Sequence, residues 1–343
     1  MNDTGGRAKQ GAVAWVESPL QLLNAVEYGA TGVRLDVLPR QGVRQLERTV
    51  EVIRDRLPEG VRILQPVRSA ADRRFRTAAH RVIGDAFSGQ FRLLLVRAPR
   101  PGLTVVDDGS LTLHLASALI EGPFGRMAQR ESAGMRLLGR AASARLRAAA
   151  ARGAVGVFTV YADAPEVRRL DRAGFRVVRN EYTWLRALPP VADLPGRPTV
   201  VLGSALVTDA QIGLADYTAW LTALARQAPI EYLPHRRESD EQLAAIGSIP
   251  GVRVARTDLP AELVLASASA VRRVLTFPSS AVATLGAILP AGRVEVVSVP
   301  EHWWLPSADP ALRRAFAAMA PAAGASWQRP HDESAARGEG EVR

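Results

Sequence analysis

The sequence predicts an α/β protein that contains two parallel-sheet domains joined by a linker. Short apolar runs rich in Val, Leu and Ile alternate with longer amphipathic stretches, as in units of strand, crossover helix and strand. This alternation is interrupted at residues 188–198, where four prolines and one glycine exclude regular helix or central strand. A chain of 343 residues, 47% of them hydrophobic, is also long enough to bury two cores.

The first half of the chain alternates between predicted strands and predicted helices. An amphipathic helix is expected at residues 22–30, a second at 41–57, where Pro58 ends it, and a third in the Ala- and Arg-rich segment 126–152. Buried strands are expected at 12–16, 33–38, 61–64, 91–96, 103–106, 155–160 and 175–178.

The same alternation restarts after the linker. Strands are expected at 199–202, 230–233, 252–255, 274–277 and 294–297, and helices at 209–226, 238–246 and 281–288. Two similar halves imply a cleft between them. Open α/β sheets bind ligands beyond the carboxyl ends of their strands, so polar residues at those ends are the candidates for a site.

The predicted domain boundaries follow from these patterns. The first eleven residues are polar and glycine-rich and are expected to be flexible, and the last dozen are polar and charged and are expected to be disordered. The predicted segments are a flexible N-terminus at 1–11, a first domain at 12–187, the linker at 188–198, a second domain at 199–300, a helical segment at 301–331 and a tail at 332–343.

The composition narrows the classes of function. The net charge of +10 comes almost entirely from arginine, since Lys9 is the only lysine. Most of these arginines are expected on solvated helix faces, but a basic surface also attracts phosphates, acidic glycans or the anionic inner face of a membrane. The absence of cysteine excludes disulfides, thiolate metal sites and a cysteine nucleophile.

The chain also lacks several targeting and binding signatures. No apolar run resembles a signal peptide or reaches the ~18 residues of a membrane span, so we expect a cytoplasmic protein with at most peripheral membrane contact. Helix-turn-helix, zinc-finger and RNP signatures are missing, and aromatic residues make up only 6% of the chain. A role in binding nucleic acid is therefore disfavoured.

Two adjacent carboxylates, Asp107 and Asp108, follow the predicted strand 103–106. Successive strand side chains point to opposite faces, so one is expected to face a substrate and the other to brace the loop. Gly109 allows a sharp turn, and Ser110 is placed to cap the next helix, although Asp-Asp-Gly is also common turn chemistry. The adjacency does not match an Asp-x-Asp metal clamp, so no metal is expected.

A second polar cluster follows the predicted strand 230–233. Pro234 ends that strand, and the residues after it are His235, Arg236, Arg237 and Glu238. Glu238 is at the expected start of the next helix. Imidazole, guanidinium and helix-start N–H groups together suit an anion such as phosphate.

A third polar cluster, Ser279 and Ser280, lies between the predicted strand 274–277 and helix 281–288. Its hydroxyl and N–H groups also suit an anion at a helix start, and one serine is equally placed to cap that helix. Ser204 follows another predicted strand and is expected to face the cleft.

The ordered motifs resemble those of the bacterial sialyltransferases and polysialyltransferases of the two-domain GT-B type. Those families carry a (Asp/Glu)-(Asp/Glu)-Gly motif, a His-Pro motif and a Ser-Ser or Ser-Thr pair. The matching residues here are Asp107-Asp108-Gly109, His235-Arg236 and Ser279-Ser280, and Glu17-Ser-Pro-Leu-Gln21 resembles their Thr/Ser-Pro-Leu-Gln start. The resemblance covers residues 12–300 and implies two Rossmann-type domains that face each other across a cleft.

The resemblance implies a metal-independent, inverting transfer of a sialic acid or related sugar from a CMP donor to a glycan hydroxyl. It makes Asp108 the general base, supported by Asp107, and places His235 at the CMP phosphate. The other residues implied on the donor side are Arg236, Arg237, Glu238, Ser279, Ser280, Glu262 and Ser204. Those implied on the acceptor side are Ser18, Pro19, Gln21, Gly109 and Ser110.

One position departs from the family pattern, because Arg236 replaces the proline after the histidine. The donor sugar is therefore open: a transferase for CMP-Kdo or a UDP-sugar would share the architecture, and so would a non-catalytic glycan- or nucleotide-binding relative. No cofactor is expected. The expected partners are a CMP-activated sugar, a glycan or glycolipid acceptor and the anionic inner membrane.

Overall fold

The computed structural model describes residues 11–97, 102–121, 124, 132–191, 196–255 and 257–319. Every predicted segment has residues outside these ranges: 1–10 of the N-terminus, 98–101, 122–123 and 125–131 of the first domain, 192–195 of the linker, 256 of the second domain, 320–331 of the helical segment and all of the tail. The described residues contain two parallel sheets, of seven and five strands. The predicted α/β class with two parallel-sheet domains is therefore confirmed.

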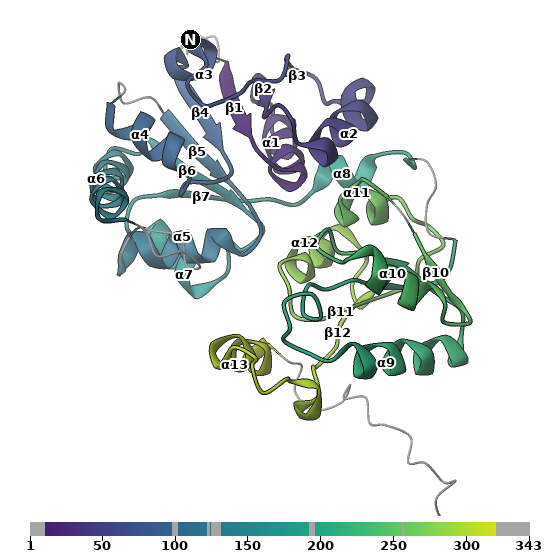
Figure 1. The fold of residues 1–343 in the computed structure, drawn as a ribbon. Helices are drawn as coiled ribbons and strands as arrows, with labels where there is room; N and C mark the ends of the chain where they lie inside the picture. Colours follow the sequence, from purple (N-terminus) through teal and green to yellow (C-terminus); the bar gives the residue numbers. More distant parts are fainter. Residues whose placement is uncertain are drawn as a thin grey trace, which may run out of the picture. The chain divides into compact units, whose positions relative to one another are not determined.

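The described residues belong to two compact units (Figure 1). The described residues within 11–191, 257–269 and 279–291 form one unit, and those within 196–255, 270–278 and 292–319 form the other. The first unit thus includes two segments that follow the second unit's early strands in sequence.

The seven-stranded sheet has the order β3-β2-β1-β4-β5-β6-β7, with every neighbouring pair parallel. Its strands are β1 (Ala12–Val16), β2 (Leu35–Pro39), β3 (Val61–Ile63), β4 (His80–Ile83), β5 (Gly102–Val106), β6 (Val155–Thr159) and β7 (Arg176–Arg179). The direction of strand addition reverses between β1 and β4, which makes this a doubly wound sheet with a topological switch point.

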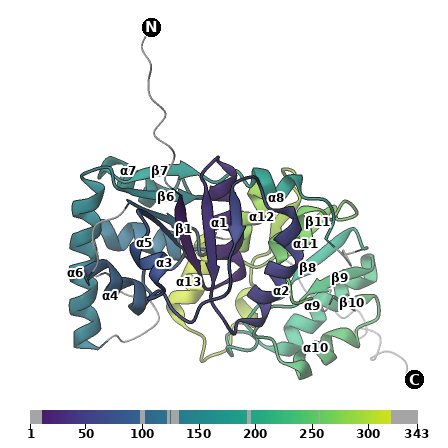
Figure 2. The same ribbon diagram turned by 90° about the horizontal axis from the view of Figure 1, so that it is seen from above.

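Helices cover both faces of this sheet. Their bounds are α1 (Pro19–Ala30), α2 (Arg44–Ile53) with the 3₁₀ turn η1 (Arg54–Arg56), α3 (Arg73–Thr77), α4 (Gly89–Arg97), α5 (Leu111–Ile120), α6 (Ala133–Ala150), α7 (Pro165–Arg172) and α8 (Thr183–Ala187). Figures 1 and 2 show α1, α2 and α8 on one face and α4, α5, α6 and α7 on the other. The apolar stripes of these helices and the strand side chains bury the core between the layers.

The prediction of a strand at residues 91–96 is wrong, because this apolar run lies in helix α4. Its leucines favour helix over strand, and a short apolar run carries too little periodicity to separate the two. The strand that the sequence analysis did not predict is β4. Its residue Arg81 is only 2% exposed. The guanidinium of Arg81 donates hydrogen bonds to the carbonyls of Phe75 and Arg76 at the end of α3. These bonds give the buried N–H groups of Arg81 acceptors inside the protein.

The five-stranded sheet has the order β10-β9-β8-β11-β12, again with every pair parallel. Its strands are β8 (Thr199–Leu202), β9 (Ile230–Leu233), β10 (Val252–Val254), β11 (Arg273–Thr276) and β12 (Val294–Val296). The helices that alternate with these strands or follow them are α9 (Leu214–Gln227), α10 (Asp240–Gly247), α11 (Ala261–Ala266), α12 (Ala281–Ile288), the 3₁₀ turn η2 (Glu301–Trp303) and α13 (Pro310–Met319).

The second unit has a core centred on packed aromatic rings. Trp220 of α9 lies against Tyr217, Phe277 and Trp303, with ring centroids between 5.4 and 6.2 Å from its own. These rings bury η2 and the end of β11 against α9. No described helix combines the length and the apolar character needed to cross a bilayer.

Each sheet has one topological switch point, and each switch point carries predicted site residues. In the first sheet, the segments after β1 and β4 begin with Glu17 and Gly84, and Asp107 follows the neighbouring strand β5. In the second sheet, Gly203 follows β8 at the switch point and Pro234 follows the neighbouring β9. Ligands of doubly wound sheets bind at such positions.

Candidate active site

Asp107 is a buried structural carboxylate. Its side chain is fully shielded from solvent, its Oδ1 accepts a hydrogen bond from Thr112 Oγ1 at 2.7 Å, and its Oδ2 accepts one from the backbone N–H of Val160 at 2.7 Å. Burial raises the pKa of Asp107 to about 6, although these hydrogen bonds act in the opposite direction. Asp107 therefore links the end of β5 to α5 and to the end of β6.

Asp108 points to the other side of the loop and is partly exposed. Ser18 Oγ donates to its Oδ1 at 3.3 Å, and Gln21 Nε2 donates to its Oδ2 at 2.9 Å. Both donors come from the start of α1, about ninety residues earlier in the chain. The structure thus brings the predicted acceptor-side residues Ser18 and Gln21 onto the predicted base.

The start of α1 is built to hold this geometry. Ser18 is the N-cap and accepts from the Gln21 N–H at 3.2 Å, while Pro19 occupies the first helical position, where its missing N–H costs nothing. Gln21 Oε1 accepts from the Glu17 N–H at 2.9 Å, so its Nε2 is oriented toward Asp108. A Cβ at Gly84 would come 2.2 Å from Gln21 Cγ, so only glycine leaves room for this side chain.

Gly109 turns the chain after the carboxylates with a φ of +62°, a conformation that favours glycine. Within the same unit, a Cβ at Gly109 would come 2.9 Å from Ser280 Oγ, so the loop after β5 lies against the predicted serine pair. Neither the Ser110 nor the Ser280 side chain makes a capping hydrogen bond, so the cap expected at Ser110 is not formed. Both residues have αR backbones rather than the extended conformation of an N-cap.

Two buried amides extend the support of the loop. Asn24 Nδ2 donates to the Asp107 carbonyl at 2.9 Å, and Asn180 Nδ2 donates to Asn24 Oδ1 at 3.0 Å. The sequence interpretation gave neither residue a role. The sequence does carry a signal for Asn24, because it is a polar residue between Leu23 and Val26 in an otherwise apolar helical stretch. Asn180 follows β7 and has no comparable sequence signal.

The second polar cluster is organised by Glu238. Its Oε1 accepts from Tyr232 Oη at 2.5 Å and from Gln242 Nε2 at 2.8 Å, and its Oε2 accepts from the His235 N–H at 2.6 Å. The expected helix start at Glu238 is wrong by two residues. Helix α10 begins at Asp240, because Ser239 caps it by accepting from the Gln242 N–H. Glu238 instead folds back and shapes the loop after β9.

We expect the stability of the wild type, relative to Glu238→Gln, to fall as the pH rises from about 4.5 to about 7. Burial raises the pKa of Glu238 to about 7, so the folded state holds a proton that the unfolded chain has lost. This contribution is complete below pH 4.5, and its loss amounts to ~3 kcal/mol. Urea unfolding of both proteins at pH 4.5 and 7.5 measures the difference. An equal difference at both pH values would contradict the raised pKa.

His235 presents its Nε2 as a hydrogen-bond donor. The Arg237 backbone N–H donates to His235 Nδ1 at 3.2 Å, so Nδ1 is an acceptor and the proton of the neutral ring lies on Nε2. Partial burial, followed by the charges of Arg237 and Arg236, lowers the pKa of His235 and favours the neutral ring. Within the described residues, Nε2 has no hydrogen-bond partner, which leaves this N–H for a ligand.

The two arginines beside His235 differ in their contacts. Arg237 forms a two-bond ion pair with Asp209, at 2.8 and 2.7 Å. Arg236 is exposed and makes no ion pair to any residue that the structure describes. Arg236 is therefore the free cation of this loop, whereas Arg237 fixes the loop to the segment after β8.

Gly203 allows the segments after β8 and β9 to approach closely. A Cβ there would come 2.3 Å from Glu238 Oε2 and 2.5 Å from the His235 backbone nitrogen, so larger residues do not fit. Ser204, the next residue, uses its Oγ to accept from the Leu206 N–H at 3.2 Å, and its own N–H also bonds to Glu238. Ser204 thus supports the loop that carries His235.

Glu262 and Ser279 belong to the first unit, as does Ser280. Glu262 is 8% exposed, and its Oε1 accepts from Thr284 Oγ1 at 2.9 Å, which links α11 to α12. Burial raises the pKa of Glu262. Ser279 is exposed at the start of the turn into α12. Within the described part of the chain, no three His, Asp or Glu side chains are grouped as metal ligands.

The comparisons with known proteins find likenesses of fold alone. No family model matches the chain, and no curated protein matches it. Among solved structures, the chain is similar to an α/β-galactoside α-2,3-sialyltransferase of Photobacterium phosphoreum, with 10% identity, a TM-score of 0.45, and coverage of 85% of this chain and 92% of that one.

Two further solved structures are similar to the same extent. A heptosyltransferase of E. coli, solved with ADP-2-deoxy-2-fluoro heptose, has 11% identity, a TM-score of 0.42, and coverage of 90% of this chain and 99% of that one. UGT2 of Phytolacca americana, solved with UDP-2-fluoro-glucose and pterostilbene, has 10% identity, a TM-score of 0.46, and coverage of 83% and 80%.

Proposed function

We propose that this protein is a metal-independent, inverting glycosyltransferase that moves a sialic acid or related sugar from a CMP donor to a glycan hydroxyl. The observation that carries the proposal is the double hydrogen bond from Ser18 and Gln21 to Asp108. Two motifs that the family resemblance names separately converge on one partly exposed carboxylate at a topological switch point. A carboxylate held in this way is positioned to accept a proton.

Asp108 acts as the general base in this proposal. The acceptor hydroxyl approaches the exposed side of the carboxylate and transfers its proton to Asp108 as the oxygen bonds to the anomeric carbon of the donor. Ser18 and Gln21 orient the carboxylate, while Asp107 fixes the loop through its hydrogen bond from the Val160 N–H. Because the attack and the departure occur in one displacement, the configuration at the anomeric carbon is inverted.

His235 and Arg236 act on the leaving group. As the new bond forms, the bond between the anomeric carbon and the phosphate oxygen breaks, and its electron pair remains on CMP. The Nε2–H of His235 donates to the phosphate and the free Arg236 guanidinium neutralises its charge, which replaces the role of a metal ion. We propose further that residues 12–187 hold the acceptor and residues 199–300 hold the nucleotide.

A donor panel tests this function. We expect the protein to release CMP from CMP-sialic acid or CMP-Kdo in the presence of mixed glycan acceptors, with and without a chelator, and to release no UDP from UDP-sugars. UDP release alone would assign the chain to the alternative class of UDP-sugar transferases. If the protein neither releases nor binds any of these nucleotides, both the CMP-sugar and the UDP-sugar transferase assignments are contradicted.

Gly84→Ala should impair catalysis although residue 84 does not contact a substrate in this proposal. The new Cβ displaces Gln21, which removes one charge-assisted hydrogen bond from Asp108. We expect a fall in kcat of about tenfold, with an unchanged KM for the donor, from steady-state rates of nucleotide release. Gly134→Ala is the matched control, because a Cβ there meets nothing within 4 Å. A fall in the control, or none in Gly84→Ala, would contradict this role for Gln21.

The proposed partners follow from the same chemistry. They are a CMP-activated sugar and a glycan or glycolipid acceptor, and the net charge of +10 favours a peripheral contact with an anionic membrane surface that presents a glycolipid.

A further inference from the structure

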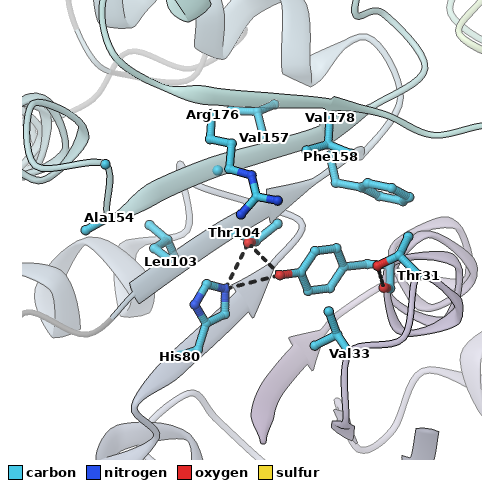
Figure 3. A pocket seen from close by; sticks show the side chains of 13 residues that line it. Thr31, Val33, His80, Leu103, Thr104, Ala154, Val157, Phe158, Arg176 and Val178 are labelled. Carbon is cyan, nitrogen blue, oxygen red and sulfur yellow. Dashed lines mark hydrogen bonds between the residues drawn. The ribbon is translucent and has the colours of Figure 1, made fainter. Parts of the chain in front are cut away.

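A cavity of about 400 Å³ lies in the first unit and is lined by thirteen residues, none of which belongs to the loop of Asp107 and Asp108 (Figure 3). It is lined by residues of β4 to β7, among them His80 at the start of β4, and by the end of α1, whereas the carboxylate loop follows the end of β5. Thr104, at its floor, is four residues before Asp108, or ~13 Å away along the strand. The cavity is therefore separate from the candidate active site.

Three polar groups meet at the floor of this cavity. His80 Nε2 lies 2.9 Å from Thr104 Oγ1 and 3.5 Å from Tyr28 Oη, and Thr104 Oγ1 donates to Tyr28 Oη at 3.2 Å. Figure 3 shows His80 and Thr104 joined by one of these contacts. Hydroxyl groups that both donate and accept suit the hydroxyls of a ligand.

Two glycines keep the space over the strands open. A Cβ at Gly102 would come 2.4 Å from His80 Nδ1, and a Cβ at Gly156 would come 3.3 Å from Thr104 Oγ1. Gly102 therefore lets the imidazole lie across the start of β5. Gly156 leaves the adjacent face of β6 uncovered, as part of the cavity lining.

Arg176 gives the cavity a positive charge. Its guanidinium extends over the cavity toward Thr104 in Figure 3, and the described residues that line the cavity include no carboxylate. Burial, followed by the charge of Arg176, lowers the pKa of His80, so the imidazole is neutral near pH 7. Arg176 is thus the one charged group in this lining.

Apolar side chains complete the walls. Val157, Phe158 and Val178 contribute from β6 and β7, and the Phe158 ring centroid lies 5.5 Å from that of Tyr28. Cavities of this size, apolar with a few convergent polar groups, are typical of small-molecule sites.

We propose that this cavity is a second ligand site, which binds a hydroxylated carboxylate of sugar size such as a uronic acid. The carboxylate pairs with the planar fork of Arg176, the ring hydroxyls bond to Tyr28 and Thr104, and the C–H face of the ring packs against the partly exposed Val178. A carboxylate fits better than a phosphate, because one guanidinium matches a single negative charge. The proposal does not depend on the transfer reaction proposed above.

Titration with glucuronate and with glucose tests the site, because the two ligands share a ring and differ in the carboxylate. We expect glucuronate to bind the full-length protein at millimolar concentrations by calorimetry or ligand-observed NMR, and glucose to bind at least tenfold more weakly. Arg176→Gln should weaken glucuronate binding about tenfold. Arg140→Gln, a change at an exposed arginine of α6, should leave it unchanged.

The other outcomes would overturn the proposal. Glucose binding as tightly as glucuronate would remove the role of the charge, and wild-type affinity in Arg176→Gln would place the ligand elsewhere. Glucuronate binding that is lost in Asp108→Asn or His235→Ala would assign it to the candidate active site. An unchanged thermal unfolding midpoint confirms that Arg176→Gln folds, and Thr104→Val provides a second variant that removes a hydroxyl from the floor.

Discussion

Asp108→Asn should abolish most of the transferase activity, with a fall in kcat of ~10²–10⁴-fold, the range that general bases contribute. The amide has nearly the shape of the carboxylate and can still pair with Ser18 and Gln21, so the loop should keep its structure. It cannot accept the proton of the acceptor hydroxyl at neutral pH. Nucleotide release, measured with saturating donor and acceptor, checks the rate, and thermal unfolding checks the fold.

Asp107→Ala is the informative contrast to Asp108→Asn. Removing the buried carboxylate leaves the Val160 N–H and the Thr112 hydroxyl without an acceptor, at a cost of about 1–3 kcal/mol for each group. We therefore expect a clear loss of stability in Asp107→Ala and almost none in Asp108→Asn. Wild-type kcat in a well-folded Asp108→Asn protein would remove Asp108 from the mechanism.

His235→Ala should lower kcat by ~10²–10³-fold, which is the typical cost of removing one donor to a developing negative charge. The neutral ring of His235 offers its Nε2–H to the leaving phosphate, and alanine offers nothing in its place. Single-turnover rates of nucleotide release separate this chemical effect from donor binding.

The arginines beside His235 supply two controls with opposite expectations. Arg236→Gln removes the free cation and should raise the donor KM about tenfold, as expected for a charge-assisted contact. Arg237→Gln breaks an exposed ion pair with Asp209, which is worth at most ~1 kcal/mol, and should change KM little. A larger effect at Arg237 than at Arg236 would contradict the division of roles between them.

The sequence was sufficient to predict the parallel-sheet class because strands such as β5 and β8 are mostly apolar runs bounded by turn residues. The sequence-based prediction of individual elements was wrong where a tertiary contact outweighs the local composition. In β4, Arg81 is buried because the carbonyls at the end of α3 accept its hydrogen bonds, a partnership that no local pattern shows. In α4, the leucine-rich run has the apolar content of a strand but the preference of a helix.

The candidate site was predictable as a set of motifs but not as a set of contacts. Alternation along a strand led to the expectation that Asp107 and Asp108 point apart, and they do so. The pairing of Gln21 with Asp108 depends on β1, β4 and β5 being neighbours in the sheet, which the sequence order alone does not reveal. The steric role of Gly84 and the inward turn of Glu238 likewise depend on three-dimensional proximity.

The most direct test of the central claim is the transfer reaction itself. Wild type, Asp108→Asn and His235→Ala are incubated with CMP-sialic acid and mixed glycan acceptors, and CMP release and the mass of the glycan product are followed together. The account predicts one sugar transferred for each CMP released by the wild type, and losses of at least ~10²-fold in both variants. CMP-sialic acid left intact by the wild type, together with CMP-Kdo left intact under the same conditions, would contradict it.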